Sequence, residues 1–247
     1  SCPRFYSAVN YLQSVPYLIN QRVLAIMLHC RERSLEVGGL PSPENEPLPT
    51  RELDMDDLEA RRRWRRRARL VHEQNVRSQS LRIHVSKLGY LANRLQDSTI
   101  FFVHTADFRQ RLYTESSGFL QPQGNDWARS LLSYGFSKPL NDDGVRELAI
   151  TGANLFGIGG SFESRLQWVS DNDAEIRRIE SDPMRYRDLW ANADKPWQTL
   201  AWAIEWGQMH KQGKKFESRL VCHRDATCNG LQVFSMLLRD ESAAKTV

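Results

Sequence analysis

The sequence predicts an α+β fold in which helices predominate. Several windows carry apolar residues at helical spacing, and the window from residue 11 to 31 would place them along one stripe of a helix. Two short segments, 98–104 and 219–224, are instead predicted as strands, the first because β-branched and aromatic residues fill it. A chain of 247 residues with 40% hydrophobic content can bury a substantial core around these elements.

The N-terminal part is predicted as helices separated by a linker. The helix at residues 11–31 is interrupted only by Pro16. Residues 37–50 read VGGLPSPENEPLPT, and these glycines and prolines predict a linker or mobile loop. Another helix is predicted to begin near Asp54, because the acidic residues that follow complement the positive end of a helix dipole. Its pattern continues through residues 70–96.

The C-terminal part is predicted to be mostly helical. The expected helices cover residues 127–132, 142–155 and 162–179, the segment that begins at Pro196, and residues 230 to about 245. The helix after Pro196 carries Trp197, Trp202 and Trp206. A helix with this many aromatic side chains is unlike a surface helix. We therefore expect these three side chains to lie in the core.

One segment concentrates the basic residues of a chain whose net charge is only +4. Residues 61–69 read RRRWRRRAR, and at helical spacing the arginines form adjacent rows of like charge. Such rows repel unless an anion lies between them. A solvated helix face is the alternative, but so many guanidinium groups around an aromatic residue favour binding to a phosphate backbone. The candidates for phosphate contacts are Arg61, Arg62, Arg65, Arg66 and Arg69.

Bulk features exclude several classes of protein. No run of about 18 apolar residues could span a bilayer, and the first residues lack the pattern of a secretory signal. The first thirty residues contain no Asp or Glu, so a mitochondrial address stays open. The cysteines show no spacing that suits zinc, which predicts reduced thiols without a disulfide or a structural metal: Cys2, Cys30, Cys222 and Cys228.

A carboxylate stands between the last predicted strand and the last predicted helix. The carboxylate of Asp225 would project beyond a sheet edge. There it could coordinate a cation together with the backbone carbonyl of Ala226. Magnesium prefers such oxygen ligands. A lone aspartate at this position is more often a helix cap or a turn residue, so spacing alone leaves both interpretations open.

The surrounding residues carry a family resemblance. Residues 225–247 read DATCNGLQVFSMLLRDESAAKTV and resemble motif A of the single-subunit phage and mitochondrial RNA polymerases, DGSCxGxQHxxAxxRDxxxxxxV. Other blocks follow the family in the same order along the chain: Asn20 with 23–25, the D-F-R-Q-R of 107–111, residues 124–132, and Lys138 with Pro139. The chain is similar in particular to the small subunit of the split, two-chain RNA polymerase of enquatrovirus-like phages.

The resemblance implies a right-hand polymerase fold, with the thumb and the first part of the palm in this chain and a partner chain completing them. Residues 1–36 would form the helix leading to the thumb and residues 37–52 a flexible linker. Residues 53–97 would form arginine-rich thumb helices. Residues 98–247 would form the palm part, including the R-x-R element and motif A.

The resemblance also assigns roles. Asp225, with the backbone of Ala226, would hold two Mg²⁺ ions for nucleotidyl transfer. Arg109 and Arg111 would contact the DNA template or the RNA–DNA hybrid, and Arg129 is a weaker candidate for the same role. Related DNA polymerases carry a glutamate that blocks a 2′-hydroxyl where this chain has Gly230, so ribonucleoside triphosphates should fit and RNA should be the product.

Three positions depart from the family pattern. Gln110 replaces a glycine, and Val233 replaces a histidine. Gln167 stands where some members carry a lysine, so a contact to the triphosphate could be missing or supplied elsewhere.

The family needs fingers and a second catalytic aspartate, which we expect from a second polymerase subunit. A promoter-opening or single-stranded-DNA-binding factor is expected as a further partner, and a membrane is not. The expected location is the cytoplasm of an infected bacterial host, with the mitochondrial matrix as the alternative. Two alternatives remain: a non-catalytic nucleic-acid-binding protein derived from a polymerase palm, and a fragment of one long polymerase.

Overall fold

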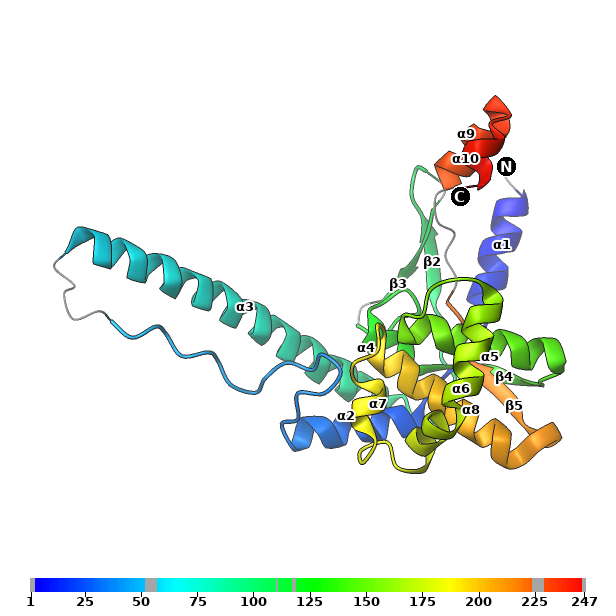
Figure 1. Cartoon of the computed structure of the whole chain (residues 1–247), viewed down its shortest axis with the longest axis horizontal. Helices are drawn as coiled ribbons and strands as arrows, with labels where there is room; N and C mark the ends of the chain where they lie inside the picture. Colours follow the sequence, from blue (N-terminus) through cyan, green and yellow to red (C-terminus); the bar gives the residue numbers. More distant parts are fainter. Residues whose placement is uncertain (1–2, 52–56, 110, 117–118, 224–228, 246–247) are drawn as a thin grey trace.

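The computed structural model describes residues 3–51, 57–109, 111–116, 119–223 and 229–245. The fold is α+β and mostly helical, as predicted. A helical body carries one long helix that projects away from it (Figure 1). No helix among the described residues is long and apolar enough to cross a membrane.

The N-terminal segment contains two helices and a strand. Helix α1 (Pro3–Gln13) and helix α2 (Gln21–Glu32) flank strand β1 (Tyr17–Ile19). The prediction of one helix over 11–31 is therefore wrong between Gln13 and Gln21. Pro16 lacks a backbone donor and disfavours helical geometry before it, and strand pairing then takes up the residues that follow. The side chain of Asn20 accepts a hydrogen bond from the backbone N of Val23 at 3.2 Å, which starts α2.

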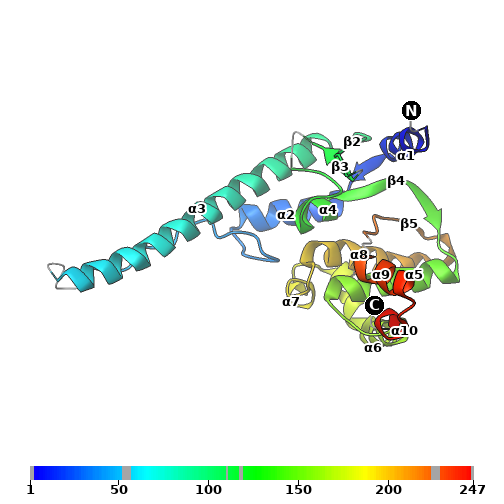
Figure 2. The same cartoon turned by 90° about the horizontal axis from the view of Figure 1, so that it is seen from above.

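Helix α3 (Leu58–Arg94) is a single helix of 37 residues. The carboxylate of Asp57 caps it by accepting from the backbone N of Glu59 at 2.9 Å and of Ala60 at 3.3 Å. The predicted continuous helical pattern is confirmed, although the helix begins at Leu58. Only the C-terminal end of α3 contacts the body, and the arginine-rich end projects (Figures 1 and 2).

The segment predicted as a linker has no helix or strand, but it lies along α3 (Figure 1). We call residues 40–51 the strap. Three α3 side chains, Trp64, Asn75 and Arg82, bind it. Their partners are the carbonyl of Pro49, the backbone N and carbonyl of Glu46, and oxygens of Ser42, Glu44 and Asn45. These contacts are spread over much of the helix and hold the strap against α3. The composition of the segment, rich in glycine and proline, did not predict this packing.

Two antiparallel sheets support the body. Strands β2 (Val103–Ala106) and β3 (Leu112–Glu115) form a hairpin, and β1 pairs with β4 (Leu132–Pro139), which pairs with β5 (Glu217–Leu220). Both predicted strands exist. The strand predicted at 98–104 is β2, which begins later in the chain, and the strand predicted at 219–224 is β5, which begins earlier. Ile100, inside the predicted strand 98–104, makes only an isolated bridge to Tyr17.

The core of the body surrounds helix α8 (Pro196–Gln212). Trp197 and Trp202 are fully buried, and Trp206 is nearly so, which confirms their predicted place in the core. Helices α4 (Asp126–Ser130), α5 (Asp142–Phe156) and α6 (Phe162–Ser181) pack against α8, with α7 (Arg187–Trp190) and the 3-10 turn Gly213–Lys215 at its ends. The predicted helices are all present here.

The C-terminal helix predicted for 230–245 is in fact two helices. Helix α9 (Asn229–Leu238) and helix α10 (Glu241–Lys245) meet at Arg239, whose positive φ of 52° ends the first. Helix α9 leaves most of its apolar side chains half or more exposed: Leu231, Val233, Phe234, Met236, Leu237 and Leu238. Exposed apolar surface of this kind is typical of interaction sites.

A buried carboxylate ties three helices together. Glu180 of α6 is only 5% exposed. One of its oxygens accepts from Arg22 of α2 at 3.0 Å, and the other binds Lys211 of α8. Burial works against ionisation, but the hydrogen bonds from Lys211 and Arg22 outweigh it, so the pKa of Glu180 lies below its usual value of 4.5. A glutamate with a lowered pKa contributes stability above pH 4.5, and this contribution is lost as the pH falls through the lowered pKa.

Replacing Arg22 and Lys211 together by alanine should lower the free energy of unfolding at pH 7 by about 3 kcal/mol, because it leaves the buried carboxylate uncompensated. It should also reverse the pH dependence. Burial alone would then raise the pKa of Glu180, so the loss should shrink as the pH falls. Thermal unfolding between pH 4 and 8 measures both effects, and Glu180→Gln in the same background should restore stability at pH 7. Parallel pH profiles for the wild type and the double variant would contradict this account.

Candidate active site and nucleic-acid interface

The turn between β2 and β3 is built on Asp107. One carboxylate oxygen accepts from the backbone N of Arg109 at 2.9 Å and of Arg111 at 3.0 Å. The other accepts from Nε of Arg109 at 2.8 Å and from the hydroxyl of Tyr113 at 3.3 Å. Partial desolvation opposes ionisation of Asp107, but these hydrogen bonds outweigh it and lower the pKa of the carboxyl. Asp107 is therefore ionised at neutral pH and fixes the shape of the turn.

This turn treats its two arginines differently. The guanidinium of Arg109 is held by Asp107 and by the hydroxyl of Tyr113 at 3.2 Å, and it also lies over the ring of Phe108. The side chain of Arg111 is exposed and has no hydrogen bond or ion pair with any described residue. Arg111 is thus the arginine of the pair that is available to an external phosphate, a distinction the sequence did not make.

Arg129 of α4 lies beside His223 in a small cavity of about 50 Å³ between α4, α5, α8 and the segment after β5. Nε of Arg129 and Nε2 of His223 are buried and have no hydrogen-bond partner in the described part of the chain. Burial, assisted by the positive charge of Arg129, lowers the pKa of His223 to about 4, so the imidazole is neutral at pH 7. The sequence analysis did not single out His223.

Asp225 and Ala226 lie outside the described residues, two and three positions after His223. Gly230, at the start of α9, is described, and a Cβ added there would meet no atom of the other described residues within 4 Å. Among the described residues, no group of three or more His, Cys, Asp or Glu side chains could hold a metal ion. The candidate donors in this chain are one carboxylate and one backbone carbonyl, which is an incomplete set for two Mg²⁺ ions.

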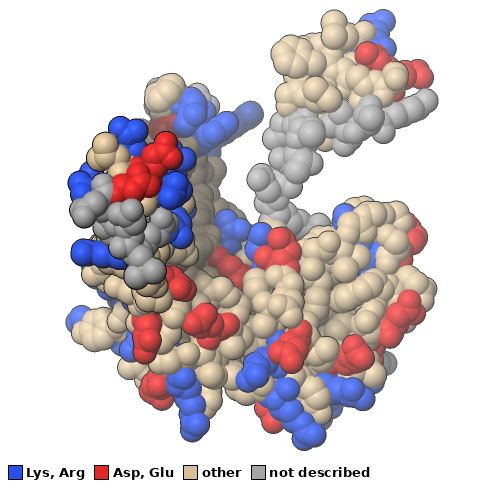
Figure 3. Space-filling model, turned by 60° about the vertical axis from the view of Figure 1, so that its left-hand side comes forward, with Lys and Arg blue, Asp and Glu red and all other residues tan. Residues whose placement is uncertain are grey.

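Four of the exposed arginines of α3 share one side of the helix. At 3.6 residues per turn, Arg62, Arg65, Arg66 and Arg69 fall within a sector of about 100° that excludes the strap-binding residues. Figure 3 views the molecule from the side on which α3 projects. It shows basic side chains on the flanks of α3, beside a hollow between α3 and the rest of the described chain. We call Arg62, Arg65, Arg66 and Arg69 the arginine face.

Few groups within the described chain would compete with a phosphate for the residues of the arginine face. Arg62, Arg65 and Arg66 have no ion pair or hydrogen bond with a described residue, and Arg69 pairs with Glu73 at 2.8 Å in an exposed bridge. Exposed bridges of this kind contribute about 1 kcal/mol or less, so a phosphate can displace Glu73. Arg61 has interactions of its own within the chain and is half-buried, so it is a poorer candidate than the sequence suggested.

The predicted site residues thus lie on separate elements. The structure brings Arg129 close to the segment that leads to Asp225, whereas Arg111 lies on the β2–β3 turn and the arginine face lies on α3. No contact among the described residues joins these three groups.

Comparison with known proteins identifies the class. Residues 138–247 match the DNA-dependent RNA polymerase family. The chain is 32% identical over 254 residues to a DNA-directed RNA polymerase of Enterobacteria phage K11, covering 99% of this chain and 27% of that protein. It is 31% identical over 249 residues to the T7 RNA polymerase of Escherichia phage T7, covering 99% and 28%. A chloroplastic/mitochondrial RNA polymerase 2B of Nicotiana tabacum is 31% identical, covering 98% and 24%.

The chain belongs to the T7-like single-subunit RNA polymerases of phages and mitochondria. It spans about a quarter of the length of the curated relatives it matches.

Proposed function

We propose that this chain forms the thumb and the first part of the palm of a DNA-directed RNA polymerase with a right-hand fold. The observation that carries the proposal is the extent of the similarity, which reaches 99% of the chain. The D-F-R-Q-R turn and the Asp225 segment therefore belong to one continuous likeness and are not isolated motifs. Helix α3 would be the thumb, and the body with its two sheets would be the palm part.

In this proposal Asp225 is a catalytic metal ligand. Two Mg²⁺ ions, when bound, would lower the pKa of the RNA 3′-hydroxyl and neutralise the phosphates of the nucleotide. The carboxylate of Asp225 and the carbonyl of Ala226 offer hard oxygen donors to such ions. His223 precedes Asp225 by two residues, and His223 and Arg129 line one cavity; these two side chains would position the segment that leads to Asp225. Open space at Gly230 leaves room for the 2′-hydroxyl of a ribonucleotide.

The arginines would hold nucleic acid and not the reacting groups. Arg111, with its unpaired guanidinium, would bind a phosphate of the template or the hybrid, and Arg109 would support the turn through Asp107. The arginine face would track the backbone of the hybrid without reading its sequence, because phosphate contacts carry no base information.

We propose that a second polypeptide supplies the fingers and the second catalytic aspartate. The support is the exposed apolar face of α9, which follows the Asp225 segment directly. Covering that face would require an apolar interface, and an obligate one would bury upwards of roughly 2,000 Å². This arrangement would resemble that of a split phage polymerase acting in the cytoplasm of an infected bacterium.

Co-expression tests the proposed function. The chain alone should be poorly soluble and should make no RNA, whereas the complex with its complementary polypeptide should synthesise RNA from a DNA template and the four ribonucleoside triphosphates. A single-stranded template should suffice without helper factors, while linear duplex DNA should need a promoter-opening factor. A complex that binds DNA but makes no RNA on either template would favour the non-catalytic alternative.

Replacing all four residues of the arginine face by glutamine should shorten transcripts and flatten the salt dependence of nucleic-acid binding. The slope of log K against log salt should fall by at most about 0.9 for each lost phosphate contact, or roughly 3.6 in all. Fluorescence anisotropy with an RNA–DNA hybrid at several salt concentrations measures it. The matched control replaces four arginines on α6 and around α7, which removes the same charge elsewhere: Arg177, Arg178, Arg185 and Arg187. Equal slopes in the two variants would contradict a specific role for α3.

A further inference from the structure

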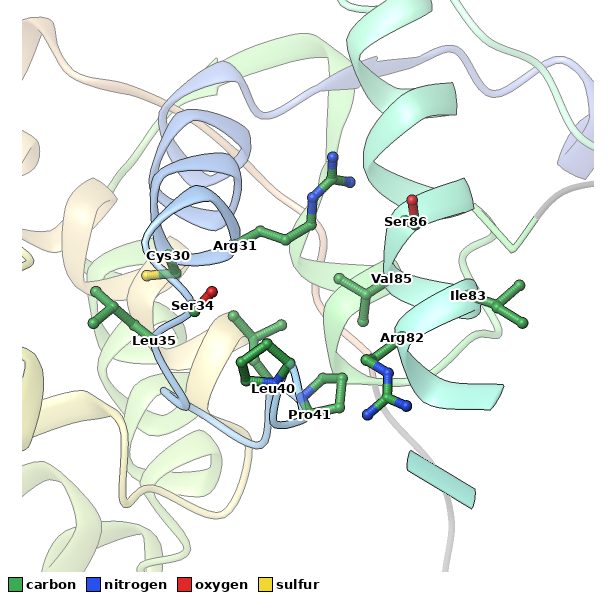
Figure 4. Close-up of a pocket in the computed structure, with 11 residues that line it drawn as sticks. Cys30, Arg31, Ser34, Leu35, Leu40, Pro41, Arg82, Ile83, Val85 and Ser86 are labelled. Carbon is green, nitrogen blue, oxygen red and sulfur yellow. The ribbon is translucent and has the colours of Figure 1, made fainter. Parts of the chain in front are cut away.

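A cavity lies at the base of α3, where the helix meets the body. Its walls come from three segments: the end of α2, the start of the strap and the last third of α3 (Figure 4). Its volume is about 370 Å³, within the range of small-molecule sites in proteins. Neither the catalytic proposal nor the arginine face uses it.

The cavity combines apolar walls with positive charge. Leu40 and Pro41 of the strap face Val85 of α3, whereas Ile83 lies at the edge of the space and points away from them (Figure 4). None of the described residues that line the space is acidic. Buried Leu40 and Val85, at 7% and 3% exposure, form the floor, and half-exposed Ile83 forms part of the rim. Such a surface suits an apolar ligand body, and the charge around it suits an anion.

Two guanidinium groups line the cavity, but only one is open to a ligand. Arg82 is occupied by the strap, since it donates to the carbonyl of Ser42 at 3.0 Å and to Oδ1 of Asn45 at 2.6 Å. Arg31 reaches from α2 towards α3, with Nη1 beside Gly89, and it has no hydrogen bond or ion pair with a described residue (Figure 4). A cation without a described partner at the edge of an apolar cavity is a polar group that can orient a ligand, and the hydroxyls of Ser34 and Ser86 also line the space.

We propose that this cavity binds an amphipathic organic anion, with its apolar body between Leu40 and Val85 and its carboxylate or sulfonate on Arg31. Because the ligand would touch α2, the strap and α3 together, it would fix the angle at which α3 leaves the body. Any effect on RNA synthesis rests on the proposed function, but the binding itself does not.

Anilinonaphthalene sulfonate is a suitable probe, because it joins an aromatic body to one sulfonate, and phenylnaphthylamine is its neutral counterpart. The exposed apolar face of α9 can also bind the dye, so every protein is prepared with Phe234→Ser to weaken that site. Fluorescence titration then compares this parent with Arg31→Gln, which removes the anchor, and with Ile83→Glu, which places a carboxylate on the rim. Val76→Glu, two turns earlier on the same side of α3, is the matched control, since Val76 is also exposed and lies outside the cavity.

The parent should bind the sulfonate at one saturable site. Arg31→Gln should weaken binding of the sulfonate about tenfold, because a charge-assisted hydrogen bond accounts for about that factor. Ile83→Glu should weaken binding by a similar factor, because its carboxylate would repel the sulfonate. Val76→Glu should leave the affinity unchanged. Phenylnaphthylamine should bind more weakly than the sulfonate and should not respond to Arg31→Gln. Equal affinity of the sulfonate for the parent and both cavity variants would overturn the proposal, and this readout does not depend on whether the chain is part of an active polymerase.

Discussion

Replacing Asp225 by alanine in the assembled complex should reduce template-dependent RNA synthesis by about a thousandfold or more. Loss of a metal ligand removes several kcal/mol of transition-state stabilisation, and each 1.4 kcal/mol or so is a factor of ten in rate. Affinity for an RNA–DNA hybrid should change little, because in the proposed function the arginine face and Arg111 would carry the phosphate contacts. Single-turnover extension of a labelled primer, with hybrid binding measured on the same samples, separates the two effects.

The asparagine variant separates a metal ligand from a helix cap. Asparagine caps a helix about as well as aspartate does, but its neutral amide is a poor ligand for Mg²⁺. Asp225→Asn should therefore keep the stability of the complex and lose its activity, as Asp225→Ala does. If Asp225→Asn extends the primer at near the wild-type rate, then Asp225 is a cap and the catalytic carboxylates lie elsewhere.

The elements with strong local signals were predictable. Helix α3 and the buried tryptophans of α8 follow from helical periodicity and from the mismatch between an aromatic helix and a solvent surface. The D-F-R-Q-R block that the resemblance singled out falls at the connection between β2 and β3. These features depend on residues close together in the chain, so one sequence is enough to show them.

The features that escaped prediction depend on distant partners. Strand β1 exists because Tyr17 pairs with Tyr134, and no local pattern around Pro16 reveals that pairing. The strap looked like a linker because its glycines and prolines form no regular element, whereas Asn75 and Arg82 of α3 hold it in place. Secondary-structure patterns say nothing about such irregular but ordered segments.

The candidate site was predictable in its residue types but not in its detail. The sequence offered Arg109 and Arg111 as equivalent contacts, and only the geometry of the Asp107 turn separates them. The proximity of Arg129 and His223 was missed for the same reason, since those residues lie far apart in the chain and line one cavity only after folding.

Helix α5 packs tightly against Trp202 of α8 at Gly152. A Cβ built there would lie 2.0 Å from two ring carbons of Trp202, closer than any two non-bonded atoms can be. The ring cannot move aside easily, because Trp202 is fully buried and its indole N donates to the carbonyl of Leu148 at 2.7 Å. Glycine is thus required here for space and not for a special backbone angle.

Gly152→Ala should therefore destabilise the chain by about 3 kcal/mol, at the upper end of the usual cost of overpacking and despite alanine's better helix propensity. For a domain of this size that corresponds to a fall in Tm of roughly 6–12 °C. Intrinsic tryptophan fluorescence during thermal unfolding reports it directly. Gly159→Ala is the matched control: a Cβ there meets nothing within 4 Å, so the Tm should stay the same or rise slightly. Equal Tm values for the two variants would mean that α5 and α8 can separate at no cost, and the close contact between Gly152 and Trp202 would then not contribute to the stability of the helical body.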